Sequence, residues 1–114
     1  MLDGTLTVEV KSRGVEFAVT VTNADTEPVD LQFRSGKVAD VAVYDRGSEV
    51  WRWSEGRMFT QAVRTETLAP GESFTHEVTW VGASPGKYTA EATLEATNVT
   101  LVERTEFAVP PPSG

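Results

Sequence analysis

The chain has 114 residues, with 17 acidic and 10 basic side chains, a formal net charge of −7 and no cysteine. This length fits one domain with a single core, and the lack of thiols excludes disulfides, thiolate metal sites and cysteine nucleophiles. The shortage of clustered Lys and Arg argues against nucleic acid and membranes as partners, and no apolar run approaches the roughly 18 residues that span a bilayer.

The first part of the chain alternates apolar and polar residues with a period of two. Thr5–Val10 and Val15–Thr22 both follow this pattern, which is typical of half-buried antiparallel strands. The short connection Lys11–Gly14 predicts that the two strands form a hairpin. The polar segment Thr22–Pro28 then predicts a turn that ends the second strand.

Two shorter strands are predicted next. Val29–Phe33 has its apolar residues on one face and breaks at Ser35–Gly36. Val41–Asp45 follows and stops at the turn-forming residues Arg46–Ser48. The chain then enters its most unusual stretch.

That stretch is Glu49–Val63, which contains two of the three tryptophans and one of the two methionines. Trp51 and Trp53 share a predicted strand face, and Arg52 points to the other face. We interpret the tryptophan pair as part of the core or its rim, since aromatic residues carry much of the burial in small β-domains. A platform for stacking a ligand is the alternative.

The next residues carry weaker signals. Met58–Val63 fits either a short strand or a helical turn, because its periodicity does not decide. Arg64–Gly71 has the composition of a loop. Within it, Leu68–Gly71 predicts a turn with proline and glycine in its two central positions.

Three strands are predicted in the rest of the chain. Phe74–Trp80 and Tyr88–Leu94 both alternate, and the turn-forming residues Ser84–Gly86 lie between them. Val99–Val109 is the last strand, and a change of phase near Arg104 suggests a β-bulge.

Together these elements predict an all-β fold, an immunoglobulin-like antiparallel β-sandwich of about seven to nine strands. We expect a single domain in residues 1–109, followed by a flexible proline-rich tail in residues 110–114.

The sequence offers few residues for catalysis. His76 is the single histidine, so a Ser/His triad would need it, yet it lies in phase with the apolar residues of its strand. We interpret it as a hydrogen-bonded histidine in the core or at its rim. No calcium-binding or glycine-rich phosphate loop is present. We therefore expect a binding or structural protein that is not an enzyme and holds no metal or cofactor.

The composition also suggests where the protein works. Met1–Gly4 leads directly into a strand pattern, without the basic and apolar regions of a signal peptide, so we expect a cytoplasmic protein. Lysine is rare, and acidic residues with threonine fill the predicted outer faces. Such a surface is typical of halophilic proteins, in which hydrated carboxylates resist salting-out. We expect a haloarchaeal source, with an acidic mesophilic protein as the alternative.

Several short segments, in order and with compatible spacing between Leu6 and Leu94, carry a family resemblance. They are Val19–Asn23, Glu27–Val29, Phe33–Gly36, Val43–Asp45, Val50–Ser54, Met58–Ala62, Leu68–Glu72 and Trp80. The chain is similar in these segments to the BsuPI family of intracellular proteinase inhibitors. The resemblance implies an immunoglobulin-like sandwich that inhibits a subtilisin-like serine protease.

An inhibitor that binds like a substrate needs an exposed, rigid loop with a side chain suited to the protease pocket. The turn after the tryptophans is our candidate, because aromatic residues on both sides could anchor it. Its residues are Ser54, Glu55, Gly56, Arg57 and Met58, with Arg57 or Met58 as the pocket residue.

Other interpretations stay open. Ser54–Met58 could be an ordinary turn whose flanking aromatics only fill the core. The loops Arg64–Gly71, Ser35–Asp40 and Gly82–Gly86 are alternative contact regions. The whole chain could also be a non-inhibitory immunoglobulin-like module that binds another protein through its sheet edges or turns.

Overall fold

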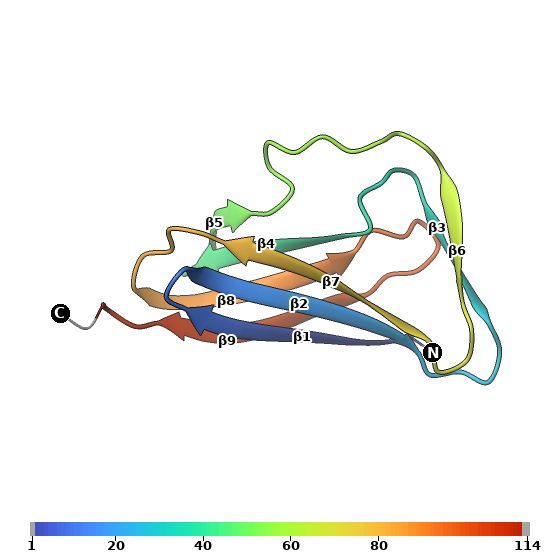
Figure 1. The fold of residues 1–114 in the computed structure, drawn as a ribbon, viewed down its shortest axis with the longest axis horizontal. Coiled ribbons are helices and arrows are strands. Elements are labelled where there is room, and N and C mark those ends of the chain that lie inside the picture. Colours follow the sequence, from blue (N-terminus) through green and yellow to red (C-terminus); the bar gives the residue numbers. More distant parts are fainter. Residues whose placement is uncertain (1, 113–114) are drawn as a thin grey trace.

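The computed structural model describes residues 2–112 and contains nine strands that pair antiparallel (Figure 1). They are β1 (Leu2–Lys11), β2 (Gly14–Asn23), β3 (Val29–Phe33), β4 (Ala39–Asp45), β5 (Ser48–Arg52), β6 (Arg64–Leu68), β7 (Ser73–Trp80), β8 (Gly86–Leu94) and β9 (Val102–Val109). Among the described residues no helix has the length and apolarity needed to span a bilayer. Met1 of the expected domain and Ser113 and Gly114 of the expected tail lie outside the described residues.

One layer of the fold consists of β1, β2 and β7, in that order. The register of β1 and β2 runs from Leu2 opposite Asn23 to Lys11 opposite Gly14, which leaves a two-residue turn. The hairpin predicted from the alternating pattern is therefore confirmed. Inward-facing positions of β2 alternate with partly exposed ones along the whole strand, as a period of two requires.

The second layer contains β5, β4, β8 and β9, and β3 and β6 form a separate two-stranded sheet that crosses its end (Figure 1). Phe33 at the end of β3 bridges to Ala96, just beyond β8, and the Thr97 N–H donates to the Gln32 carbonyl at 2.7 Å. β3 therefore adjoins the extension of β8, and β4 pairs with β8 itself. β6 pairs with β3 and β5 pairs with β4, so the connection from β3 to β4 lies beside the connection from β5 to β6.

The core lies between the two layers in two parts. The larger part comes from β2, β4, β7 and β8: Val15, Phe17, Val19, Ala39, Val41, Val43, Val78, Trp80, Tyr88, Ala90 and Ala92. The smaller part lies beside β3 and β6: Val21, Leu31, Phe33, Leu68 and Leu94. Burial of these side chains is the main favourable term for folding, and their spacing explains why each strand presents one face inward.

The segment before β7 differs from the prediction. The first five residues of the expected loop Arg64–Gly71 form β6, because β3 offers them a backbone edge for hydrogen bonding. Residues 58–63, all of them described, are neither strand nor helix. The predicted turn is confirmed: the Glu72 N–H donates to the Ala69 carbonyl at 2.9 Å, and Gly71 has a φ of 80°.

The last strand also differs in detail. β9 begins at Val102 rather than Val99, and its register with β8 is unbroken along the strand. The bulge expected near Arg104 is therefore wrong. The register shift in this layer lies instead between Val43 and Tyr44, where β4 pairs with β5.

Asn23 closes the end of the sandwich where β2 meets the turn after β6. Its side chain is fully buried, and its Nδ2 donates to the carbonyls of Glu27 at 2.8 Å and Leu68 at 2.9 Å. Its Oδ1 accepts the N–H of Asp25 at 2.9 Å. One buried side chain thus bonds three backbone groups from two turns.

We predict that Asn23→Ala lowers the free energy of unfolding by about 2–4 kcal/mol, because the carbonyls of Leu68 and Glu27 lose their donor and a buried side chain is removed. Urea denaturation followed by tryptophan fluorescence measures this change. Asn98→Ala is the matched control, since Asn98 also bonds two backbone groups, at Gln32 and Asp30, but is exposed. Equal losses in the two variants would contradict the role given to burial.

Candidate functional site

Two segments leave the sheet side by side. The first excursion, Arg34–Val38, connects β3 to β4, and the second excursion, Trp53–Val63, connects β5 to β6. They meet where the Gly36 N–H donates to the Thr60 carbonyl at 2.9 Å. A Cβ on Gly36 would lie 2.7 Å from Thr60 Oγ1, so the close approach needs a glycine.

The two excursions enclose an open hollow of about 430 Å³, with the candidate loop Ser54–Met58 on one side. The lining residues are Ser35, Lys37, Ser54, Arg57, Met58, Phe59 and Gln61. Part of the loop Ser35–Asp40, which the sequence offered as an alternative contact region, therefore shares one surface with the candidate loop.

Asp40 lies beneath this surface and joins its parts. Its carboxylate is 2% exposed and accepts five hydrogen bonds. Oδ1 accepts the backbone N–H groups of Val41 at 2.9 Å and Ser54 at 3.1 Å. Oδ2 accepts the Ser54 hydroxyl at 2.5 Å, Lys37 Nζ at 3.2 Å and Arg52 Nη1 at 3.2 Å. The start of the candidate loop is therefore fixed to β4.

These contacts keep the buried carboxyl ionised. Burial alone would raise the pKa of Asp40, but the hydrogen bonds from Ser54, Lys37 and Arg52 outweigh it and hold the pKa below its ordinary value. Lys37 also pairs with Glu95 at 2.8 Å. A buried charge with this many partners is costly to leave unpaired, so the neighbouring chain is held in place.

Sequence reasoning did not single out Asp40. A usable signal is present, because a lone carboxylate stands directly before the apolar run Val41–Val43, with a lysine three residues earlier. What the sequence does not display is that Arg52 and Ser54 return to the same point from another strand.

The five predicted residues differ in their surroundings. Ser54 is half-buried on Asp40, whereas Glu55 and Gly56 form the exposed tip of the turn, with Gly56 at a φ of 78°. Arg57 folds back: its Nε donates to the Trp53 carbonyl at 2.8 Å, and its guanidinium lies 4.8 Å from the centre of the Trp53 ring. Met58 is 97% exposed.

The aromatic residues around the loop support it from below. Trp51 lies against the core, with ring centres 5.9 Å from both Phe17 and Trp80. Trp53 lies nearer the loop and contacts Phe59 at 5.6 Å and His76 at 4.7 Å. The interpretation of the tryptophans as core and core rim agrees with these contacts, and Trp53 supports both ends of the loop.

His76 is half-buried on β7 with its ring edge-on to Trp53. Its Nε2 is buried and has no hydrogen-bond partner among the described residues, so the hydrogen bond expected there is not formed. Burial lowers the pKa of His76, while the nearby Asp40 charge raises it less. In the described part of the chain, no group of three or more His, Cys, Asp or Glu residues could hold a metal ion.

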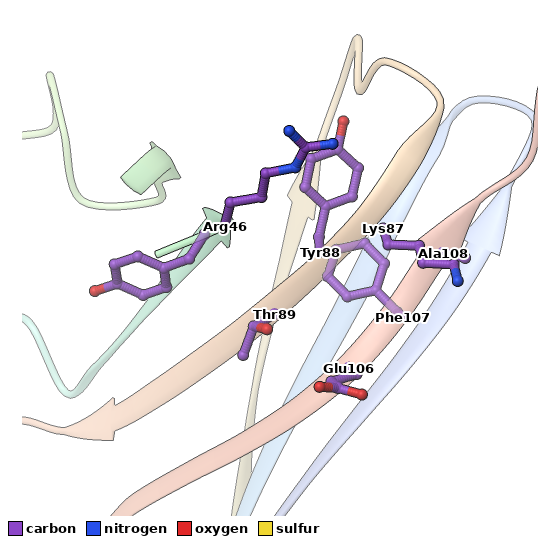
Figure 2. Close-up of a pocket in the computed structure, with 8 residues that line it drawn as sticks. Arg46, Lys87, Tyr88, Thr89, Glu106, Phe107 and Ala108 are labelled. Atoms are coloured by element: carbon purple, nitrogen blue, oxygen red, sulfur yellow. The ribbon is translucent and has the colours of Figure 1, made fainter. Parts of the chain in front are cut away.

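Another open hollow, of about 510 Å³, lies at the opposite end of β4 and is shown in Figure 2. Arg46, which has a φ of 53°, extends toward Tyr88, and Lys87 and Glu106 lie on the neighbouring strands. The length of β4 separates this hollow from Asp40, so it does not belong to the candidate surface.

The chain is similar to one protein family and to solved structures of another domain. The model of the family described as BsuPI, intracellular proteinase inhibitor, matches residues 2–99. A search of curated proteins gave no match.

Two solved structures of the CARDB domain of a Pyrococcus furiosus protein are similar in fold. The crystal structure, a complex with di-metal ions, aligns with a TM-score of 0.55 and 19% identity over 98% of this chain and 94% of that one. The solution NMR structure aligns with a TM-score of 0.49 and 20% identity over 96% of each chain. The likeness to the crystal structure shows an immunoglobulin-like fold, as the sequence predicts.

The half-buried His76 makes the stability of the fold depend on pH. Because the folded-state pKa of His76 lies below the ordinary value of 6.5, the unfolded chain binds its proton first as the pH falls. Stability is therefore fully present above pH 6.5 and decreases as the pH falls toward the folded-state pKa.

We expect the melting temperature to fall on acidification through this range, and His76→Phe to flatten the dependence. Melting temperatures at a series of pH values measure both. An unchanged pH dependence in the variant would show that other groups are responsible.

Proposed function

Because the chain belongs to the BsuPI family of intracellular proteinase inhibitors, we propose that it inhibits a subtilisin-like serine protease through the candidate loop Ser54–Met58. The family gives the general role and implies a protease as partner. The serine-protease target and the contact loop Ser54–Met58 are proposed in addition. The family's intracellular description also supports the expected cytoplasmic location.

The observation that carries the proposal is the exposure of Met58 beside an anchored chain. Its side chain is 97% exposed, although transfer of a methionine side chain out of water is favourable. A protease pocket lined by apolar groups would bury it. Arg57 is the weaker choice as pocket residue, because its guanidinium would first have to leave Trp53.

Both flanks of Met58 are held. On one side Ser54 is bonded to Asp40, and on the other side Thr60 is bonded to Gly36. A loop fixed in this way loses little conformational entropy on binding. If the protease cut the chain beside Met58, both new ends would remain anchored, so product release would be slow and the bond could re-form.

The rim of the hollow extends the contact beyond one loop. A specific protease–inhibitor interface buries on the order of 800 Å² on each partner, more than a five-residue turn provides. Ser35 and Lys37 of the first excursion lie on the same hollow as Met58 and would contact the protease with it.

We predict that Met58→Asp weakens inhibition of subtilisin at least about tenfold, because a charge replaces the apolar group that enters the pocket. Stability should not change, since the side chain is exposed. The inhibition constant, measured with purified chain in dilute buffer and in concentrated salt, tests this.

The matched control is Val81→Asp. Val81 is 74% exposed but lies between β7 and β8, outside the candidate surface. The Val81→Asp variant should inhibit the protease as strongly as the wild type. Equal inhibition by Met58→Asp and the wild type would show that another loop contacts the protease. A wild-type chain without inhibition would favour the non-inhibitory interaction module.

A second prediction concerns the anchor. Asp40→Asn keeps the shape of the side chain but removes the charge that holds Lys37 and Arg52. We expect the variant to be cut by subtilisin between residues 54 and 60 several times faster than the wild type. Mass spectrometry of timed digests measures the rate and locates the cut.

Asn23→Ala serves as the control for this measurement, because it should lower global stability without touching the candidate loop. If it were cut at the same place and rate as Asp40→Asn, general unfolding would explain the cleavage, and the anchoring role of Asp40 would be wrong.

A further inference from the structure

β6 forms an open edge of the two-stranded sheet that it makes with β3. It pairs with β3 on one side, and its residues Arg64–Thr67 are all exposed. The hydrogen bonds on the far side of β3 show which groups of β6 face outward. The Gln32 N–H donates to Asn98 Oδ1 at 3.0 Å, and the Gln32 carbonyl accepts the Thr97 N–H at 2.7 Å. Gln32 therefore directs its backbone away from β6.

Antiparallel strands alternate between residues that bond to the partner and residues that point away from it. Since Gln32 points away, Leu31 and Phe33 bond to their partners on β6, which are Glu66 and Arg64. Thr65 lies between these two β6 residues and Thr67 follows Glu66. Both threonines therefore direct their N–H and carbonyl groups to the open edge. An edge of this kind can pair with another strand.

The edge lacks the strongest protective features. β6 contains no proline, lysine or register shift, three of the usual means of preventing edge pairing, and its two charged residues, Arg64 and Glu66, have opposite signs. The outer edges of β1 and β9 are different, because those strands lie close together: a Cβ on Gly4 would be 2.6 Å from the Leu101 side chain.

The charges on β6 favour a particular antiparallel pairing with a second β6. When Thr65 lies opposite its own copy, Arg64 of each chain faces Glu66 of the other, and opposite charges on facing positions attract. When Thr65 lies opposite Thr67, Glu66 faces its own copy and like charges repel. The side chains of Arg64 and Glu66 are 44% and 56% exposed, and within one chain they pair at 3.5 Å. Dimerisation would exchange this exposed pair for the two facing pairs between the chains.

We propose that β6 is a dimerisation strand that pairs with β6 of a second copy, with Thr65 on the two-fold axis. The two β3–β6 pairs then form one continuous sheet in the order β3, β6, β6, β3. Val63, which is 77% exposed, would lie opposite Thr67 of the second chain and lose part of its exposure. This pairing does not depend on protease inhibition. A contact this short is expected to be weak, with a dissociation constant between about 1 μM and 1 mM.

Sedimentation velocity of the full chain over a range of concentrations tests the proposal. We expect a monomer–dimer equilibrium that Glu66→Arg weakens at least about tenfold, since it places a second arginine opposite Arg64 of the other chain. The double variant Arg64→Glu, Glu66→Arg should restore dimerisation, because it exchanges the two charges. Glu77→Arg, on the exposed face of β7, makes the same change in net charge and should leave the dimer intact.

Thr65→Pro provides a second test, because proline removes an outward N–H without affecting the bonds to β3. It should abolish the dimer, whereas Thr65→Val should retain it. A wild-type chain that stays monomeric up to about 1 mM overturns the proposal and leaves the edge available to another protein. A dimer that survives both Glu66→Arg and Thr65→Pro also overturns it, because the interface must then lie elsewhere.

Discussion

The buried carboxylate of Asp40 is the constraint on which the candidate surface depends. An ionised group that is 2% exposed must satisfy its lone pairs inside the protein, and here β4, β5 and both excursions supply the donors. Such a group contributes little net stability, because desolvation offsets attraction. Its effect is on conformation: any arrangement that moves Ser54 or Lys37 away leaves a buried charge unpaired.

The strand arrangement explains why two separate connections form one surface. β3 and β4 are consecutive strands, and their respective partners β6 and β5 are consecutive too, so the connection from β3 to β4 lies beside the connection from β5 to β6. The contact between Gly36 and Thr60 then closes the pair. The sheet below and the contact between the two loops above thus hold the candidate surface in one arrangement.

Much of the fold could be predicted from the sequence, and the failures share a cause. Alternation gives the hairpin of β1 and β2 and the inward faces of β7 and β8, because a half-buried strand has a period of two. β6 could not be predicted, since Arg64–Thr67 is exposed on both faces and becomes a strand through pairing with β3. The five residues of the candidate loop could be chosen from their aromatic neighbours. Asp40 could not, because its partners are distant in sequence.

The second excursion also affects how the protein can change during evolution. Trp53–Val63 connects β5 of the second layer to β6 of the two-stranded sheet, so its length does not set the register of the sheet on either side. Residues can be gained, lost or exchanged at its tip while the anchors at Ser54 and Thr60 and the core beneath stay the same. The same core can therefore carry tips of different length and sequence, so the surface at this end of the protein can change without a change in the fold.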